Sequence, residues 1–379
     1  MQKKIVLVAN SAFTLINFRY ELIQSLVGAG HQVYVICPPA CKLISGDVSS
    51  QFLKLGVQFM PVSFQRNSMN PFSDIKLFLE LLMCFRRVKP HVIINYTIKP
   101  FIYSSIAAKL VGKAKITIAS NVTGLGYIFT DNSLKVILIR NIIKLQLSIA
   151  ARFNDLIFFQ NPDDKSDYIH NKIISLKTKT KIINGSGVNL NKFYYSPKSK
   201  TESVTFLFIA RLLKDKGVNE FVAAAKKVKI LNPNTRFIMV GPLDSNPTSI
   251  TKAEIESFHS KGIIEYRGAS ENVVPHLIEC DVFVLPSYRE GTPRTILEAM
   301  SIGRPIITTD APGCKECIED SYNGYLVPVR SIEHLSDAML RLANSSLLRA
   351  EMGYRSRLIA TNKYNVDLIV KEVRNALGI

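Results

Sequence analysis

Residues 281–300 read DVFVLPSYREGTPRTILEAM, and this stretch decides the fold class. Its first five residues are an apolar run that predicts a buried strand. Thr292 is the predicted N-cap of a following helix, and Pro293 falls in the first turn, where a missing N–H is tolerated. A buried strand that runs through a short loop into a helix is the repeating unit of an α/β protein with parallel strands.

Two carboxylates flank the start of this helix, because Glu290 and Glu298 are separated by seven residues. If Glu298 lies two turns along that helix, the two acids are roughly 12 Å apart at about 1.5 Å per residue. That exceeds the ~9.5 Å limit for two acids that serve one glycosidic bond. It matches the span of a ribose, a diphosphate and part of a sugar, and free N–H groups at a helix start suit phosphates. On their own, two acids more simply indicate surface glutamates, so the interpretation depends on the rest of the chain.

Strands and helical patterns alternate along the whole chain, which predicts parallel sheets with helices on both faces. At 379 residues, of which 47% are apolar, the chain exceeds one typical core, so two domains are expected. A polar, turn-rich stretch at 184–203 marks their boundary. The predicted strands are 4–9, 32–36, 91–95, 116–120, 155–160, 205–210, 236–241, 263–267, 281–285 and 305–309.

Further motifs lie in a fixed order over residues 204–330. The segment FIARLLKDKG at 208–217 places Arg211 five positions before Lys216. Together with the two spaced glutamates, this segment resembles the R-x4-K-G and E-x7-E motifs of the retaining glycosyltransferases of family four, which have the GT-B fold. The element GVN at 187–189 has Asn where the family has Asp. The other matching motifs are VG at 240–241, YRG at 266–268, GRP at 303–305 and NG at 323–324.

The resemblance implies two Rossmann-like parallel-sheet domains that face a central cleft. Residues 1–187 would form the N-terminal, acceptor-binding domain and residues 188–360 the C-terminal domain that binds the nucleotide sugar. Residues 361–379 would be a helix that returns to the N-terminal domain. Ligands of open α/β sheets bind outside the carboxyl ends of the strands. Arg211 and Glu290 follow predicted strands and Gly241 is the last residue of one, so all three lie at carboxyl ends of strands, as this rule requires.

The family's residue roles carry over to the matching positions. Arg211 and Lys216 would hold the donor diphosphate, because fixed cations stabilise a leaving group that gains negative charge. Glu290 would contact donor-sugar hydroxyls near the reacting carbon, and Glu298 would accept hydrogen bonds from the ribose. Tyr266 and Arg267 are expected around the base, and Thr292, Pro293 and Arg294 at the sugar and distal phosphate. Gly241 and Gly291 are further expected donor contacts.

The implied reaction retains the anomeric configuration, with the leaving phosphate itself deprotonating the acceptor hydroxyl. It needs no side-chain nucleophile, and we expect neither a cofactor nor an essential metal ion, since no convincing D-x-D motif occurs. The pair Asp163 and Asp164 is expected at a helix start. The GLG at 124–126 lacks the third glycine of a dinucleotide-binding fingerprint. The CKEC at 314–317 has no second cysteine pair, so it does not indicate zinc.

The chain resembles in particular the bacterial transferases that extend undecaprenyl-diphosphate-linked glycans. The implied partners are a nucleotide sugar, UDP-hexose or UDP-N-acetylhexosamine, and a lipid-diphosphate-linked saccharide of surface polysaccharide or glycan synthesis. Asn17 and Arg19 match an Asn/His-Phe-Arg element of that subgroup and are expected to bind acceptor phosphate. The alternative is a solvated arginine at a helix start. Asn121 or Thr123 would replace a histidine that many relatives have.

The net charge of +18 is concentrated in the first half, where residues 1–190 carry 23 Lys+Arg and 9 Asp+Glu. Such a basic half indicates an anionic partner. The sequence contains no helix-turn-helix, RNA-binding aromatic motif or zinc finger, which disfavours nucleic acid. The remaining candidates for the anionic partner are a phosphorylated substrate and an anionic membrane surface. We therefore expect a cytoplasmic protein that is peripheral on the inner face of the cytoplasmic membrane.

The N-terminus, MQKKIVLVAN, has an apolar run of only five residues and predicts a first strand instead of a signal peptide. Charges interrupt the other apolar runs, so no segment of about 20 residues is expected to span a membrane. Six scattered cysteines form no disulfide pattern, which indicates a reducing compartment.

Residues 134–153 are predicted to form a helix. Arg140, Lys144, Ser148 and Arg152 recur every four residues and predict a basic stripe beside a broad apolar face. The pattern fits an interfacial helix on anionic lipid, and it equally fits a domain helix with a solvated stripe.

Two other functions fit the same fold. One is a GT-B isomerase that acts on the nucleotide sugar itself. The other is a non-catalytic membrane adaptor in a polysaccharide assembly complex. The joint presence of Arg211, Lys216, Glu290 and Glu298 argues against the adaptor.

Overall fold

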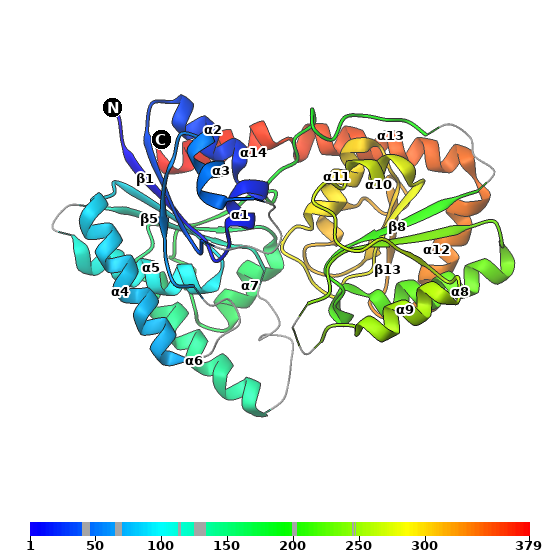
Figure 1. Ribbon diagram of the computed structural model, residues 1–379, viewed down its shortest axis with the longest axis horizontal. Helices are drawn as coiled ribbons and strands as arrows, with labels where there is room; N and C mark the ends of the chain where they lie inside the picture. Colours follow the sequence, from blue (N-terminus) through cyan, green and yellow to red (C-terminus); the bar gives the residue numbers. More distant parts are fainter. Residues whose placement is uncertain are drawn as a thin grey trace. The chain divides into compact units, whose positions relative to one another are not determined.

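The computed structural model describes residues 1–39, 46–64, 70–112, 115–124, 134–198, 203–244, 246 and 248–379, without the side chains of 134–138. The described residues form two compact units, the first Met1–Ile183 with Ile369–Ile379 and the second Asn184–Leu368. Each unit is a parallel sheet with helices packed against it, which confirms the predicted α/β class (Figure 1). The predicted domain limits, 1–187, 188–360 and 361–379, and the central cleft stay predictions.

The sheet of the first unit has seven strands in the order β3-β2-β1-β4-β5-β6-β7, all paired in parallel. The strand order reverses between β1 and β4, which makes that position the switch point of the sheet. The strands are β1 (Lys4–Val8), β2 (Gln32–Cys37), β3 (Gln58–Pro61), β4 (Val92–Tyr96), β5 (Thr117–Val122), β6 (Leu156–Phe159) and β7 (Thr180–Ile182).

Alternate side chains of these strands point to opposite faces of the sheet. Ile5 and Leu7 of β1 lie in a core with α1, α2, α3 and α14, whereas Val6 lies in a core with α4 and α5. Ile118 and Val122 are four residues apart on β5 and share a face; Ile118 packs with α4 and α5, and Val122 with α5 and α6. Helices α4, α5 and α6 therefore cover one face together. The helices are α1 (Ala12–Phe18), α2 (Tyr20–Gly28), α3 (Val48–Lys54), α4 (Pro71–Val88), α5 (Ile98–Val111), α6 (Leu134–Ala151), α7 (Pro162–His170) and α14 (Val366–Leu377).

The sheet of the second unit has six parallel strands in the order β10-β9-β8-β11-β12-β13, with its switch point between β8 and β11. Its strands are β8 (Thr205–Ile209), β9 (Arg236–Val240), β10 (Glu265–Tyr266), β11 (Val282–Leu285), β12 (Ile306–Thr309) and β13 (Gly324–Val327). Its α-helices are α8 (Val218–Leu231), α9 (Lys252–Ser260), α10 (Val274–Glu279), α11 (Arg294–Ile302), α12 (Ile332–Asn344) and α13 (Ser346–Lys363), and 3₁₀ turns are η2 (Lys214–Lys216) and η3 (Lys315–Cys317).

The strands predicted from the sequence are all present, and three further strands, β3, β7 and β13, were missed. Each missed strand is an edge strand of three or four residues. An edge strand has one neighbour and a partly exposed face, so it lacks the continuous apolar run that marks a central parallel strand.

The GRP motif has a structural role, because the side chain of Arg304 is almost fully buried and donates to backbone carbonyls. Its Nε donates to Leu277 at 3.0 Å, and its two terminal nitrogens donate to Ser196 at 2.7 Å and Ile278 at 3.1 Å. A buried guanidinium satisfied in this way fixes the end of α10 against the segment after the domain boundary.

The helix predicted at 134–153 is observed as α6, but the predicted basic stripe is not its exposed face. Arg140, Lys144 and Ser148 are partly buried, and only Arg152, just beyond the helix, is exposed. Among the side chains of α6 that the structure describes, the exposed large apolar ones are Ile142, Leu145 and Ile149. Within the described residues, no helix combines the length and apolar character needed to cross a bilayer.

Candidate functional site

Three loops of the second unit meet at the carboxyl end of its sheet, where α/β proteins bind ligands. The loop after β11 contacts the loop after β8, since the Tyr288 N–H donates to the Asp215 carbonyl at 2.8 Å and the Ser287 hydroxyl to the same oxygen at 3.2 Å. Gly217 allows this approach, because a Cβ there would lie 2.1 Å from the Pro286 carbonyl oxygen. The two loops that carry the predicted motifs are thus joined at the switch point.

Lys216 and Glu290 form the central ion pair of this site. The Lys216 Nζ lies 2.6 Å from Glu290 Oε1, and the two side chains are only 13% and 17% exposed. The Glu290 N–H donates to the Pro312 carbonyl at 2.9 Å, in the loop after β12. Gly313 has φ +84°, and a Cβ on it would lie 2.2 Å from the Glu290 carbonyl oxygen. Three loops therefore fix the position of one carboxylate and one ammonium group.

Arg211 follows β8, and its guanidinium pairs with Asp244 at 2.8 Å in the loop after β9. Gly241 lets the two loops run side by side, because a Cβ there would lie 1.8 Å from the Ala210 carbonyl oxygen. Arg211 and Lys216 thus share one loop but hold different carboxylate partners. The sequence analysis missed Asp244, for which the available signal was an acid three residues after a predicted strand.

Helix α11 begins at Arg294, with Pro293 at the N-cap position and no side-chain cap, so the prediction of Thr292 as N-cap was wrong. Pro293 also has no N–H to offer a phosphate, so within 292–294 only Thr292 and Arg294 can donate from the backbone. Because residues 290–293 precede the helix, the helical rise does not measure the distance between the two glutamates. The predicted helix start between Glu290 and Glu298 is nevertheless present.

Glu298 lies on the second turn of α11 and is 8% exposed. The Arg294 Nε lies 3.2 Å from its Oε1, and the Nη1 of Arg294 donates to the Ser186 hydroxyl at 3.1 Å. Burial raises the pKa of Glu298 above its ordinary value, and the positive charges of Arg294 and Lys192 oppose that rise. Ser186 was missed by sequence reasoning, although it lies in the polar stretch that marked the domain boundary.

We expect Glu298 to make the protein more stable at acidic than at neutral pH relative to a Glu298→Gln variant. Its pKa is raised in the folded state, so the folded protein binds the proton more tightly and the contribution is full below the ordinary pKa of 4.5. That contribution is lost as the pH rises through the folded-state pKa. Urea unfolding at a series of pH values measures it, and equal slopes for the two proteins above pH 4.5 would contradict the assignment.

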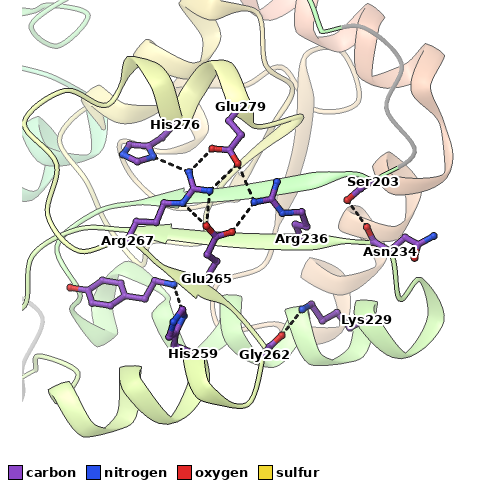
Figure 2. A network of polar contacts seen from close by, with 11 residues as sticks. Ser203, Lys229, Asn234, Arg236, His259, Gly262, Glu265, Arg267, His276 and Glu279 are labelled. Carbon is purple, nitrogen blue, oxygen red and sulfur yellow. Dashed lines mark hydrogen bonds and ion pairs between the residues drawn. The ribbon is translucent and has the colours of Figure 1, made fainter.

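Tyr266 and Arg267, predicted around the base, lie at the end of β10. The Tyr266 hydroxyl donates to the Gly241 carbonyl at 3.0 Å. The Arg267 guanidinium pairs with Glu265 at 2.6 Å and with Glu279, as Figure 2 shows. Arg236 of β9 pairs with the same two acids, so the two arginines and two glutamates together connect β9, β10 and α10. A contact of Arg267 with the base stays a prediction. Because its side chain is held in these ion pairs, such a contact would come from the backbone of Arg267.

The predicted acceptor residues lie at the carboxyl end of the first unit's sheet. Arg19 is 6% exposed and its guanidinium stacks over the Tyr96 ring at 4.4 Å, so it is not a solvated arginine. Tyr96 ends β4 opposite Asn121 of β5, whose side-chain oxygen accepts from Gln160 at 3.5 Å. Arg19 thus contacts the ring of a buried tyrosine whose register partner on the neighbouring strand is Asn121.

The remaining acceptor residues are less enclosed. The Asn17 side chain donates to the Phe13 carbonyl at 3.4 Å within α1, and Thr123 directly follows β5. Thr97 joins β4 to α5 with φ +75° and ψ 169°, a conformation that a β-branched residue rarely adopts. Sequence reasoning had no signal for Thr97. Leu125 and Gly126 of the predicted loop lie outside the described residues.

Groups suited to other chemistry are few within the part of the chain that the structure describes. No cluster of three or more His, Cys, Asp or Glu there could hold a metal ion. Cys314 and Cys317 are buried free thiols, and burial raises the pKa of Cys317 to about 12. Asp163 and Asp164 lie in the first turn of α7, as predicted, and the N-cap of that helix is Asn161.

Comparison with known proteins gives consistent matches over both units. The sequence matches the family described as Glycosyl transferases group 1 over residues 194–358 and the family described as Glycosyl transferase 4-like over residues 4–161. The N,N'-diacetylbacillosaminyl-diphospho-undecaprenol alpha-1,3-N-acetylgalactosaminyltransferase of Campylobacter jejuni is 30% identical over 363 residues, which cover 92% of each chain. The UDP-Gal:alpha-D-GlcNAc-diphosphoundecaprenol alpha-1,3-galactosyltransferase of Escherichia coli is 25% identical over 316 residues, 80% of this chain and 79% of the relative.

Solved structures show the same fold. HepE of Anabaena, solved in complex with UDP, superposes with a TM-score of 0.76 at 15% identity and covers 99% of both chains. At this identity the likeness concerns the fold.

Proposed function

We propose a function for this chain, which belongs to the group 1 and family 4-like glycosyltransferases. It moves a hexose or N-acetylhexosamine from a UDP-sugar to a lipid-diphosphate-linked saccharide. The transfer retains the anomeric configuration and serves the synthesis of a surface polysaccharide or glycan. The enzyme works at the inner face of the cytoplasmic membrane.

The observation that carries the proposal is the pairing of Lys216 with Glu290 at the point where three loops meet. A lysine ammonium has three donors, so Lys216 can hold Glu290 and a phosphate oxygen together. Arg211 lies in the same loop and brings a second cation. Cations fixed before the reaction stabilise the charge that develops on a departing diphosphate without further rearrangement.

The two acids suit the two ends of the donor. Glu298 is buried and keeps lone pairs free beyond its contact with Arg294, so it can accept from the paired hydroxyls of a ribose. Glu290 is held by loops that follow three strands and is the acid we assign to the donor sugar. The start of α11 lies between them and offers N–H groups of Thr292 and Arg294 to the sugar and distal phosphate.

In the proposed step, the bond from the anomeric carbon to the diphosphate oxygen breaks and a bond to the acceptor oxygen forms on the same face. The proton of the acceptor hydroxyl passes to the departing phosphate. No side-chain nucleophile takes part. The names of both relatives specify an alpha linkage, which retention produces from a donor whose nucleotide is in the α configuration.

The first unit is the proposed acceptor domain, with Asn17, Arg19, Asn121 and Thr123 toward the diphosphate and the first sugar. The relatives' names specify undecaprenyl-diphosphate-linked acceptors. Residues 1–190, with 23 Lys+Arg against 9 Asp+Glu, favour such an anionic acceptor and the anionic membrane that contains it.

The test combines a panel of UDP- and GDP-sugars with a short-chain prenyl-diphosphate saccharide and identifies the product by mass spectrometry and NMR. We expect one UDP-hexose or UDP-N-acetylhexosamine to give an acceptor longer by one α-linked residue. Inversion of the anomeric centre would contradict the mechanism. Conversion of the nucleotide sugar without any acceptor would replace the proposal with an isomerase.

A further inference from the structure

The outer side of α4 carries an apolar stripe that the sequence analysis did not predict. Phe72, Ile75, Leu79 and Met83 are 48–81% exposed. Their spacing of three, four and four residues places them on one side of the helix. The opposite side, with Leu77, Leu81 and Phe85, is buried against the sheet. Helix α4 is thus apolar on its outer as well as its inner side.

Helix α6 repeats this arrangement in the same layer, where Ile142, Leu145 and Ile149 are exposed at a spacing of three and four residues. Helix α5 packs against both α4 and α6, and its Tyr103 hydroxyl donates to Asp74 of α4 at 2.8 Å. The two stripes therefore lie on the two helices that flank α5. Figure 1 shows the three helices on one side of the first unit's sheet. We call these seven exposed side chains of α4 and α6 the outer helix patch.

The surroundings of the outer helix patch are basic. The exposed residues of α4 include Lys76, Arg86 and Arg87 and no acid. The two acids of α4 are paired with lysines, Asp74 with Lys99 at 2.7 Å and Glu80 with Lys76 at 3.9 Å. The sequence of α6 contains no acid, and residues 70–152 carry twelve Lys+Arg and three Asp+Glu.

We propose that the outer helix patch docks on an anionic lipid bilayer, with its apolar side chains among the acyl chains and the surrounding cations at the headgroups. The proposal deepens the proposed function, on which it rests for a lipid-linked acceptor. Apolar side chains beside cations are the composition of surfaces that lie in a membrane interface. A second copy of the chain fits less well, because a symmetric dimer through this patch would bring two basic surfaces together.

The absence of tryptophan from the sequence allows a direct test with a single fluorescent reporter. We expect the emission of a Phe72→Trp variant to shift to the blue, and to be quenched by brominated lipid, when vesicles of phosphatidylglycerol and phosphatidylethanolamine are added. The matched control is Leu53→Trp, at a 76% exposed position of α3 on the other face of the sheet. Unshifted emission from the Phe72→Trp variant, or an equal shift for both variants, would overturn the proposal.

A second measurement removes the apolar contact. The double variant Leu79→Glu/Leu145→Glu is expected to bind these vesicles with an affinity at least about tenfold lower. Leu53→Glu should bind them like the unmodified protein. All three proteins should transfer sugar equally to a water-soluble, short-chain acceptor. Unchanged vesicle binding by the double variant would overturn the proposal. So would a dimer in sedimentation velocity that the double variant dissociates, since the patch would then bind a second copy.

Transfer to the soluble acceptor distinguishes failure of the docking proposal from failure of the proposed function. If the unmodified protein transfers sugar but does not bind vesicles, the docking surface is wrong and the proposed function stands. If it binds vesicles through the patch but transfers no sugar from any donor, the proposed function is wrong and the docking surface stands.

Discussion

Replacement of Lys216 by alanine is expected to lower kcat for sugar transfer by about 100- to 1000-fold, the usual loss when one preorganised charge-stabilising donor is removed. The effect should fall on kcat more than on KM for the donor, because the charge on the diphosphate grows as the bond to the sugar breaks. The measurement is steady-state transfer to a short-chain acceptor. Thermal unfolding of the same preparation checks that the variant is folded.

The matched control is Lys214→Ala, in the same 3₁₀ turn, because Lys214 is exposed and lies two residues from Lys216. It should leave kcat within about twofold of the unmodified enzyme, as expected for an exposed surface change. Equal losses for the two variants would mean that general positive charge of the loop matters, and not the Lys216 ammonium.

A double-mutant cycle separates two roles of Lys216, which either stabilises the diphosphate itself or only holds Glu290 at 2.6 Å. If Lys216 only positions Glu290, its removal in a Glu290→Gln background should lower kcat little further. We expect Lys216→Ala to reduce kcat at least tenfold further in that background, because the leaving diphosphate still needs its cation. Full non-additivity would reassign Lys216 as a positioning residue.

Gly313→Ala is expected to lower kcat by about 100-fold, although Gly313 itself is not assigned to contact the substrate. A Cβ on Gly313 would lie 2.2 Å from the Glu290 carbonyl oxygen and 2.5 Å from that of Gly291, so the loop must move away. Displacement of a catalytic group by about 1 Å can reduce a rate by about that factor. The measurement is again kcat with the short-chain acceptor, together with urea unfolding.

Gly262→Ala is the control for the backbone part of this change. Gly262 has φ +66°, similar to the +84° of Gly313, but a Cβ there would meet nothing within 4 Å. Both variants should lose about 1–2 kcal/mol from the left-handed conformation, and only Gly313→Ala should lose activity. If the two variants kept equal activity, the loop after β12 would not position Glu290.

The motif residues could be predicted from the sequence because their order and spacing carry information. The chain order of Arg211, Lys216, Glu290 and Glu298 placed each after a strand of the second sheet, where the structure has them. The Lys216–Glu290 pair itself was not predictable, since it joins loops 74 residues apart and depends on how β8 and β11 pair. Spacing predicts which side chains are near the same edge, and only tertiary structure determines which of them touch.

The residues that support the site were missed for a related reason. Gly313, Asp244 and Ser186 have no distinctive spacing, and their importance comes from contacts with Glu290, Arg211 and Arg294. A glycine in a loop does not reveal whether its missing Cβ is needed. Asp244 and Ser186 are ordinary polar loop residues until their partners are located.

The helix surfaces show where periodicity alone is insufficient. A four-residue repeat drifts around an α-helix, so Arg140, Lys144 and Arg152 do not stay on one side over three turns. The structure accordingly exposes Ile142, Leu145 and Ile149, and partly buries Arg140 and Lys144. Which side of a helix faces the sheet depends on its neighbours, and in α4 both sides were apolar enough to be the inner one.

The most direct measurement is a crystal structure of the enzyme with bound UDP. The account predicts the diphosphate within hydrogen-bond distance of Lys216 and Arg211, and the ribose hydroxyls on the Glu298 carboxylate. A structure in which UDP lies away from the loops after β8 and β11, with Lys216 in contact with Glu290 alone, would contradict it.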